Sequence, residues 1–279
     1  MTELAVGLLS VFALPPVEFV GIAADLGCRH ISTVVRGRPL LPLGFPPFSL
    51  KDPALRRELL AAMSDRGVTI SLGDGFLVQP GADMRDFRAD LDVLAELGVP
   101  RINTVSLDPD LGRTFDQCGA LAELATQRNI ETNVEPVPGL TVGDLPTAVA
   151  AVRHVGRPDF RLLIDTMHLV RSGAGAADLA ALDPECIGYA QLSDTTLEPR
   201  VDNSIHNYME EAMYERMVPG EGELPLPDIL SALPPGVVIE LEVPRRSLAV
   251  AGVGPLDRLR PCVDAARRLL AEVSSGSTG

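Results

Sequence analysis

The sequence predicts a single α/β domain, a (β/α)8 barrel, from three observations. Eight short apolar runs alternate with segments whose apolar residues recur at helical spacing. The length, 279 residues, is the usual size of such a barrel. The first run is not followed by a Gly-x-Gly-x-x-Gly motif, which disfavours the alternative of an open, doubly wound sheet.

The strands and helices follow from these runs and from the turn residues between them. We expect strands at residues 4–12, 30–35, 68–74, 101–107, 130–136, 161–166, 187–194 and 237–244. The clearest helices are expected at residues 52–67, 83–99, 114–129 and 257–273. Asp52 before Pro53 and Gly67 at the far end are start and stop signals of a helix. Residues 1–273 are assigned to the barrel domain, and 274–279 to a disordered tail.

The composition disfavours several classes of protein. Hydrophobic residues make up 46% and charged residues 22%, which provides a sizeable core and argues against disorder. A net charge of −14 disfavours nucleic acid and anionic membranes as partners, because their phosphates attract Lys and Arg. No apolar run reaches the roughly 18 residues of a membrane span. A signal peptide has basic residues before its apolar region, and none precedes the apolar N-terminal run here. The cysteines form no Cys-x-x-Cys pair, so we expect a reduced, cytoplasmic protein.

Polar side chains lie where four consecutive predicted strands end. In a barrel, the active site is built from the carboxyl ends of the strands and the loops after them. The fifth to eighth strands end in groups that carry oxygen donors: Glu135, Asp165, Gln191, and the pair Glu240 and Glu242. Glu240 and Glu242 share one face of their strand, about 6.6 Å apart along it, and Glu242 is nearer the mouth.

These groups together predict a metal site. Carboxylates so close raise one another's pKa values unless a cation lies between them. Oxygen ligands favour Mg²⁺ or Mn²⁺, with Co²⁺ or Zn²⁺ as further candidates, and we expect one divalent ion. The predicted ligands are Glu135, Asp165, Gln191 and Glu242.

Structural roles are alternatives for several of these residues. A carboxylate at a strand end often caps a helix or pairs with a basic side chain. Glu240 is an alternative ligand to Glu242, or it pairs with a side chain in the layer below. Taken alone, Gln191 is a core amide bound to backbone, and Asp194 caps or orients a neighbour.

The motifs resemble those of the xylose-isomerase-like TIM barrels, also called sugar phosphate isomerases/epimerases, over nearly the whole chain. The stretch NVEP matches the first ligand motif of that family through Glu135, and IDTMHLVRSG matches its Asp-x-x-His motif through Asp165 and His168. The stretch LEVP matches the last strand and favours Glu242. The resemblance implies one divalent metal held by Glu, Asp, His and Glu from strands five to eight. Apurinic-site endonucleases of the same superfamily use many His ligands, whereas this chain has four His in all.

The chain departs from the family in its seventh strand. The family more often has His three residues before the Asp, whereas YAQLSD has Gln191. This Gln is similar to the fourth ligand of a subgroup that includes bacterial 3-dehydroshikimate dehydratases. The stretch YERMVPGEGELPLPDIL resembles the same subgroup, in which an Arg before PGEGELPL helps to hold the substrate. The resemblance implies that role for Arg216.

Proton removal next to a carbonyl is the expected chemistry. A metal ion on the carbonyl oxygen stabilises the enolate, and a positioned base takes the proton. A dehydratase needs one base, for which His168 is the candidate. An epimerase needs two flanking groups, for which Glu135 and Glu242 are candidates. As an alternative, His168 only hydrogen-bonds a ligand and fixes its orientation.

The long segment after the seventh strand, residues 195–224, is expected to form a lid, because long loops in compact domains are usually functional or disordered. Within it, NSIHNYMEEAMYERM predicts a short helix opened by Asn203 or Ser204. The planar guanidinium of Arg216 suits a carboxylate or phosphate on the substrate. A surface position beside Glu215 is the alternative for Arg216.

The sequence therefore predicts a divalent-metal-dependent lyase or isomerase that acts on a small keto-polyol or keto-acid. A dehydratase of the 3-dehydroshikimate type is favoured, with a sugar or sugar-phosphate epimerase or isomerase as the alternative. A metal-binding subunit that is non-catalytic or partner-dependent is the alternative from another class. Asn133 and His206 join Arg216 as substrate-binding candidates, with a helix-surface position as the alternative for His206. A homodimer is an open alternative to a monomer.

Overall fold

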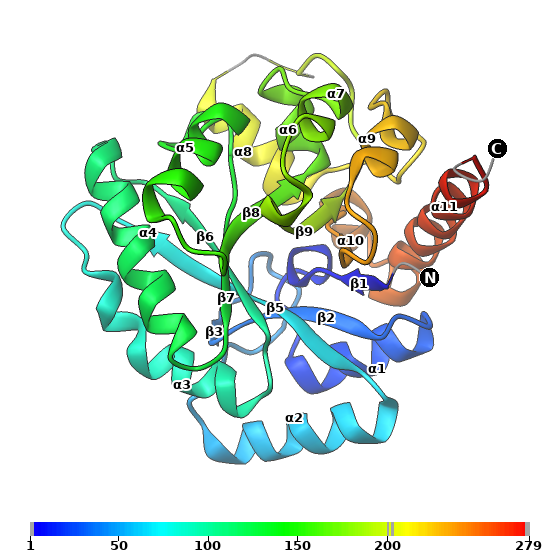
Figure 1. Ribbon diagram of the computed structural model, residues 1–279. Helices are drawn as coiled ribbons and strands as arrows, with labels where there is room; N and C mark the ends of the chain where they lie inside the picture. The colour runs from blue at the N-terminus through cyan, green and yellow to red at the C-terminus, as the bar shows by residue number, and fades with distance from the viewer. Residues whose placement is uncertain (1–2, 200, 202–203, 277–279) are drawn as a thin grey trace.

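The predicted barrel is confirmed in the computed structural model, which describes residues 3–199, 201 and 204–276. Eight parallel strands close on themselves in the order β1-β10-β9-β8-β7-β6-β5-β2 (Figure 1). Each strand overlaps one of the eight apolar runs. The strands are β1 (Leu4–Val6), β2 (His30–Val34), β5 (Thr69–Val78), β6 (Arg101–Ser106), β7 (Glu131–Val134), β8 (Phe160–Asp165), β9 (Ile187–Leu192) and β10 (Ile239–Leu241).

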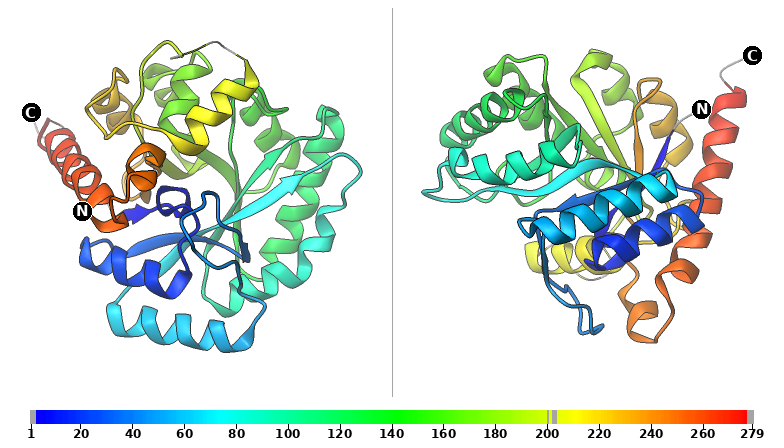
Figure 2. Two further views of the ribbon diagram at one scale, coloured as in Figure 1. Left: turned by 180° about the vertical axis from the view of Figure 1, so that it is seen from behind. Right: turned by 90° about the horizontal axis from the view of Figure 1, so that it is seen from below.

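Helices surround the barrel, and shorter elements fill the loops at its ends (Figures 1 and 2). The α-helices are α1 (Pro16–Asp25), α2 (Pro53–Arg66), α3 (Arg88–Glu96), α4 (Leu111–Thr126), α5 (Leu145–Val155), α6 (Thr166–Arg171), α7 (Ala176–Ala180), α8 (Ile205–Tyr214), α9 (Leu226–Ala232), α10 (Arg246–Val250) and α11 (Pro255–Gly276). The 3-10 helices are η1 (Leu8–Val11), η2 (Met84–Phe87) and η3 (Pro184–Cys186), and a hairpin pairs β3 (Arg36–Gly37) with β4 (Phe48–Ser49). Within the described part of the chain, no helix combines the length and the apolar composition needed to cross a membrane.

Local signals in the sequence set the ends of these helices. The side chain of Asp52 accepts a hydrogen bond from the backbone N–H of Ala54, and Gly67 ends α2 in the left-handed conformation, at φ 63°. Ser204 caps α8 in the same way, through the backbone N–H of Asn207, at 3.3 Å. Its predicted alternative, Asn203, lies outside the described residues.

The last helix extends past the predicted end of the barrel domain. The hydroxyl of Ser274 donates to the carbonyl of Leu270, and that of Ser275 donates to the carbonyl of Glu272. Helix α11 continues to Gly276, so the boundary expected at residue 273 falls inside its last turn. Residues 277–279 of the expected tail lie outside the described part of the chain.

Apolar side chains fill two separate spaces. A large cluster packs the outside of the strands against the helices. A small cluster of buried side chains, from four strands and from the residue before β10, fills the barrel itself: Ala5, Leu72, Leu163, Tyr189 and Val238. The barrel interior is therefore a packed core rather than a channel. The hydroxyl of Tyr189 donates to Glu240 at 3.1 Å, which marks the upper limit of this apolar core.

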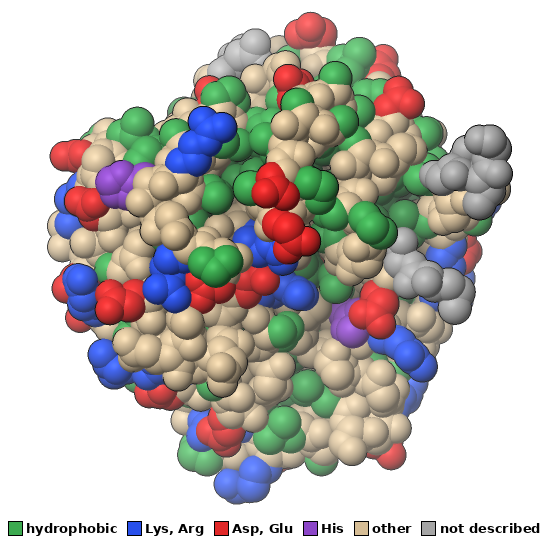
Figure 3. Space-filling model, viewed as in Figure 1, with side chains coloured by type: hydrophobic (Ala, Val, Ile, Leu, Met, Phe, Trp, Pro, Cys, Tyr) green, Lys and Arg blue, Asp and Glu red, His purple; other side chains and the backbone are tan. Residues whose placement is uncertain are grey.

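The two ends of the barrel carry different loops. Helices α8 and α10 and the β3–β4 hairpin lie on the side of the carboxyl ends of the strands (Figure 2). At the amino ends, Arg161 pairs with Glu131 at 3.3 Å and with Glu185 at 3.5 Å, and Arg101 lies 3.8 Å from Glu131. Acidic and basic side chains are mixed near the centre of the face viewed in Figure 3. The charges at the amino ends therefore pair with one another. The active site of a barrel of this kind lies at the carboxyl ends of the strands.

Asp194, just after β9, fixes the loop that begins at Met217. Its Oδ2 accepts hydrogen bonds from the backbone N–H groups of Gly220 and Gly222, at 2.8 and 3.0 Å. Its Oδ1 accepts from those of Thr195 and Leu224, at 2.8 and 3.2 Å. Asp194 thus orients its neighbours, which is the structural role expected for this residue from the sequence.

We expect Asp194→Ala to lower the free energy of unfolding by about 1–3 kcal/mol or more, because buried backbone donors lose their acceptor. Urea unfolding followed by circular dichroism measures this value. The control is Asp65→Ala on α2, an exposed residue, for which we expect a change within about 0.5 kcal/mol. Equal stability of the two variants would contradict the role of Asp194.

Candidate metal and active site

Strands β7 and β8 bring three predicted site residues together. Glu135 directly follows β7, and Asp165 ends β8 and caps α6 by accepting a hydrogen bond from the backbone N–H of His168, at 2.8 Å. This cap places His168 in the first turn of α6. Its Nε2 lies 3.5 Å from Glu135 Oε1, and its Nδ1 lies 3.9 Å from Asp165 Oδ1. One ligand atom from each of the three buried residues lies within 4.8 Å of the others.

Arg216, which follows α8, joins two of the predicted ligands. Its Nη1 lies 2.5 Å from Asp165 Oδ2 and 3.1 Å from Ser193 Oγ. Its Nη2 lies 2.9 Å from Glu242 Oε2, and its Nε donates to the carbonyl of Ala212. With 3% of its surface exposed, Arg216 lies inside the site and not on the surface. Its predicted contact with a substrate stays a prediction.

Gln191 lies against Glu240, in β10, and against Glu242, directly after it. Its Nε2 lies 3.1 Å from Glu240 Oε1 and 3.1 Å from Glu242 Oε1. Glu240 is fully buried, and its other oxygen accepts from Tyr189. Both oxygens of Glu240 are thus bound to neutral donors, whereas Glu242 reaches Arg216 beside Asp165. This geometry favours Glu242 over Glu240 as the ligand.

The fit of a divalent ion can be tested on the same residues. Gln191 is 1% exposed, and its Oε1 has no hydrogen-bond partner among the described residues. A buried acceptor without a partner costs stability, which a cation would offset. Carboxylate and amide oxygens suit a hard divalent ion. The residues therefore fit a metal, although the structure groups His168, and not Glu242, most closely with Glu135 and Asp165.

Two further polar residues of this site were not predicted. Asn103, in β6, donates through Nδ2 to Glu135 Oε2 at 2.5 Å. Asp74 lies where the register of β5 against β6 shifts, between Gly73 and Phe76. Burial first, and then the charges of nearby glutamates, raise the pKa of Asp74 well above its ordinary value. The signal for Asp74 was present in the sequence, since it closes the third apolar run as Asp165 closes the sixth.

Two predicted substrate-binding residues lie apart from the group. Asn133, in β7, is fully buried, and its Nδ2 donates to the carbonyl of Ile102 at 3.3 Å. Its Oδ1 faces Gly188, where an added Cβ would lie 2.2 Å from that oxygen. His206 is exposed on the surface of α8, which is the alternative position expected for it from the sequence. The structure therefore brings neither residue into contact with Glu135, Asp165 or His168, and their substrate contacts stay predictions.

Burial and charge act in opposite directions on these groups. Burial, and then the charges of Glu242 and Asp165, raise the pKa of Glu135 well above its ordinary value. Burial opposes ionisation of Asp165, yet the charge of Arg216, together with His168, holds the pKa of Asp165 below its ordinary value. Burial lowers the pKa of His168 to about 4, so its imidazole is neutral near pH 7.

The fold and the site together define a (β/α)8 barrel whose strand ends carry a buried acidic group able to hold a metal ion. The chain belongs to the xylose isomerase-like TIM barrel family, whose model matches residues 20–270. No curated protein matches it in sequence.

Solved structures of this fold superimpose on nearly the whole chain. A zinc-bound IolI protein is 17% identical with a TM-score of 0.79, over 98% of this chain and 99% of the other. A probable 3-DHS dehydratase, AsbF of Bacillus anthracis, is 15% identical with a TM-score of 0.72, over 96% and 99%. A D-psicose 3-epimerase of Clostridium cellulolyticum H10, solved with D-tagatose, is 16% identical with a TM-score of 0.70, over 96% and 99%. At these identities the likeness shows the fold alone.

The raised pKa values of Glu240 and Glu242 determine how the stability of the metal-free protein is expected to depend on pH. Burial is the main cause that raises the pKa of Glu240 to about 8 and that of Glu242 to about 7, from 4.5. Between pH 6.5 and 8 the folded protein therefore holds protons that the unfolded chain has released. The free energy of unfolding must fall as pH rises through this window. His168 acts in the opposite direction, but only below its ordinary pKa of 6.5.

We expect the free energy of unfolding to fall by about 1–2 kcal/mol from pH 6.5 to 8 in EDTA-treated protein. Denaturant titrations at fixed ionic strength measure it. Glu242→Gln should reduce this fall but not abolish it, because burial still raises the pKa of Glu240, whereas Glu123→Gln, an exposed position on α4, should keep it unchanged. A rise in stability over this pH range would contradict the assignment.

Gln191 provides a test of the metal site. We expect Gln191→Ala to weaken Mn²⁺ binding by about 10–100-fold, because a ligand oxygen and an orienting hydrogen bond are lost. Gln191→His should keep binding, since imidazole also ligates such ions. Titration calorimetry measures both, with Gln117→Ala on α4 as an amide control outside the site. If both Gln191 variants bind as wild type does, Gln191 is a structural residue.

Proposed function

We propose that this protein is a divalent-metal-dependent enzyme that removes a proton next to the carbonyl group of a small polyhydroxylated keto compound. The observation that carries this proposal is the buried group of Glu135, Asp165 and His168 at the carboxyl ends of β7 and β8. Burying three ionisable side chains this close together lowers the stability of the folded protein. Such clusters are typical of catalytic sites.

The metal would be held by Glu135, Asp165, Gln191 and Glu242. When bound, the ion would supply positive charge to the substrate oxygen that becomes negative as the proton leaves. Either Mg²⁺ or Mn²⁺ suits these oxygen donors, and Co²⁺ or Zn²⁺ are further candidates.

The carboxylates are the groups suited to move the proton. Burial is the main cause that raises the pKa of Glu242 to about 7, near the pH at which a general base works best, and it raises the pKa of Glu135 in the same direction. Asn103 holds one oxygen of Glu135, which leaves Oε1 directed toward His168. Glu135 is thereby fixed in orientation, with one oxygen bound to Asn103 and the other facing His168.

A dehydratase of the 3-dehydroshikimate type is the favoured reaction. Among the described residues, Arg216 is the positive side chain that pairs with Asp165 and Glu242, and we propose it as the partner of a carboxylate on the substrate. This favours a keto acid over a neutral ketose. One structure with the same fold carries the description of a probable 3-DHS dehydratase, which supports the choice.

An epimerase or isomerase of sugars is the second candidate, because one observation favours it. Glu135 and Glu242 are both linked to Asp165, the first through His168 and the second through Arg216, so the two carboxylates belong to one group. Epimerisation needs two such groups on opposite sides of one carbon. A metal-binding subunit without its own activity is the alternative from another class.

The partners and the location stay predictions. We propose a small keto acid or keto-polyol as the partner, no binding to nucleic acid or membrane, and a cytoplasmic location, with a homodimer as an open alternative. The acidic net charge of −14 and the free cysteines support these choices.

The reaction is tested by incubating the metal-loaded protein in D₂O with 3-dehydroshikimate-type keto acids and with ketohexoses. We expect loss of water from the keto acid, seen by ultraviolet absorbance and NMR, and a fall in kcat of at least about 100-fold in Glu135→Gln. Glu123→Gln serves as the control. Deuterium exchange and epimer formation with ketohexoses alone would favour the epimerase. Metal binding without turnover of either class would favour the non-catalytic subunit.

A further inference from the structure

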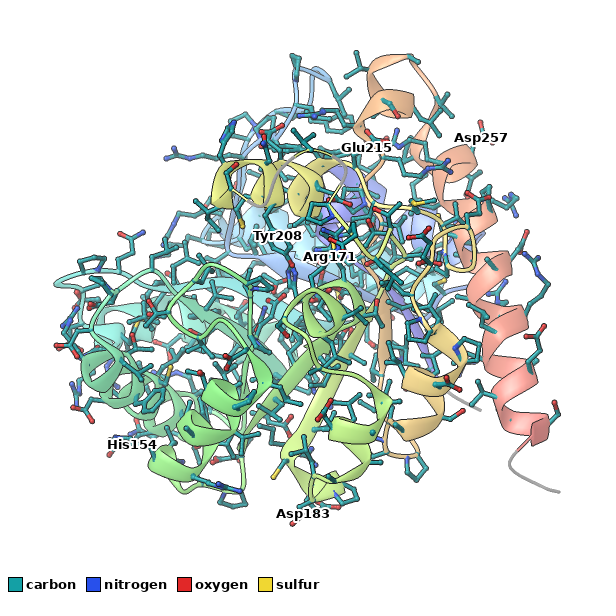
Figure 4. The ribbon with its side chains drawn as sticks, turned by 90° about the horizontal axis from the view of Figure 1, so that it is seen from above. His154, Arg171, Asp183, Tyr208, Glu215 and Asp257 are labelled. Carbon is teal, nitrogen blue, oxygen red and sulfur yellow. The ribbon has the colours of Figure 1, made fainter. Side chains whose placement is uncertain are left out.

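Helix α8 places a tyrosine directly on the histidine of the site. The hydroxyl oxygen of Tyr208 lies 2.5 Å from His168 Nδ1, and the two ring centroids are 5.6 Å apart. Tyr208 is 8% exposed and His168 is 4% exposed. Tyr208 and Arg171 lie at the end of the barrel that α8 covers, whereas His154 and Asp183 lie at the other end (Figure 4).

The direction of this hydrogen bond follows from the proton of the phenol. Burial raises the pKa of Tyr208, so the hydroxyl keeps its proton. Among the described residues, His168 Nδ1 is the acceptor within hydrogen-bond distance of that hydroxyl. If Nδ1 carried a proton and donated it, the phenol proton would be left buried without an acceptor, which costs stability. Tyr208 therefore donates, and Nδ1 accepts.

The surroundings of the other ring nitrogen, Nε2, favour the same tautomer. His168 Nε2 lies 3.5 Å from Glu135 Oε1. A proton on Nε2 directs a donor at this oxygen, whereas a lone pair on Nε2 would face the lone pairs of Glu135 in the ionised form that serves as ligand or base. Because a neutral imidazole carries one ring proton, that proton belongs on Nε2.

We propose that Tyr208 is a positioning residue that holds His168 in the tautomer with its proton on Nε2. His168 then acts as a neutral hydrogen-bond donor to a substrate oxygen and not as the base. The base is a carboxylate, Glu135 or Glu242. This division of roles rests on the proposed function, whereas the tautomer itself does not.

A second contact between the same two helices keeps Tyr208 in place. Glu211 lies one turn further along α8, and its Oε1 is 3.1 Å from Arg171 Nη2 at the end of α6. Glu211 also accepts a hydrogen bond from the hydroxyl of Thr195, after β9. Helix α8 is thus tied to α6 at both the site and the far end of α6. The lid expected from the sequence acts here as a support for the histidine.

The tautomer is measured by ¹⁵N–¹H NMR correlation spectra of the histidine side chains at pH 7, in the Mg²⁺-supplemented protein. His168→Gln identifies the resonances of His168. We expect a protonated Nε2 and an unprotonated Nδ1 in the wild type. Tyr208→Phe keeps the ring but removes the hydroxyl, so both tautomers should become populated. Tyr214→Phe, the same change on the same helix, should leave the spectrum unchanged, because Tyr214 contacts Arg246 instead.

With a turned-over substrate, Tyr208→Phe should lower kcat by about 10-fold or more with little change in KM, and Tyr214→Phe should match the wild type. A wild-type His168 protonated on Nδ1, or an identical His168 spectrum in Tyr208→Phe, would overturn the proposal. If no substrate is turned over, the proposed function fails, whereas the spectra still decide the role of Tyr208.

Discussion

The ion pairs of Arg216 with Asp165 and Glu242 are the interaction on which the site depends. Several carboxylates from neighbouring strands share a buried space, and burial, with their mutual repulsion as a further cause, raises the pKa values of Glu135 and Glu242. The guanidinium is the one positive group that touches two of them in the described residues, at 2.5 and 2.9 Å. It keeps Asp165 ionised, and an ionised Asp165 in turn caps α6 and sets the position of His168.

Helix α8 connects this charge balance to the rest of the fold. The helix carries Tyr208 against His168 and Glu211 against Arg171, and the chain after its last turn carries Arg216. One segment between β9 and β10 therefore supplies the positive charge and the contact that orients the imidazole. Asp194 anchors the remainder of this segment through four backbone N–H groups. A long connection in this barrel is thus a structural part of the site.

The barrel interior explains why the polar groups gather at one end. Leu72, Leu163 and Tyr189 form part of the apolar cluster that fills the middle of the barrel. Tyr189 ends this layer with a hydroxyl that bonds to Glu240, and Gln191 bonds to both Glu240 and Glu242 above it. The change from apolar core to acidic site takes place within two residues of β9. The alternation of side chains along a strand makes such an abrupt change possible.

The sequence by itself determined the eight strands, the barrel, and the strand ends that carry Glu135, Asp165, Gln191 and Glu242. Period-two and helical patterns and chain length report on these features locally, and strand ends of a barrel converge whatever their loops do. The tertiary structure decided the contacts among them. It paired Arg216 with two carboxylates, placed Tyr208 on His168, brought in Asp74 and Asn103, and left Asn133 and His206 apart. The sequence already marked Asp74, at the end of its third apolar run. The other outcomes depend on how neighbouring strands pack and on the path of a helix across the barrel mouth, which no local pattern of residues encodes.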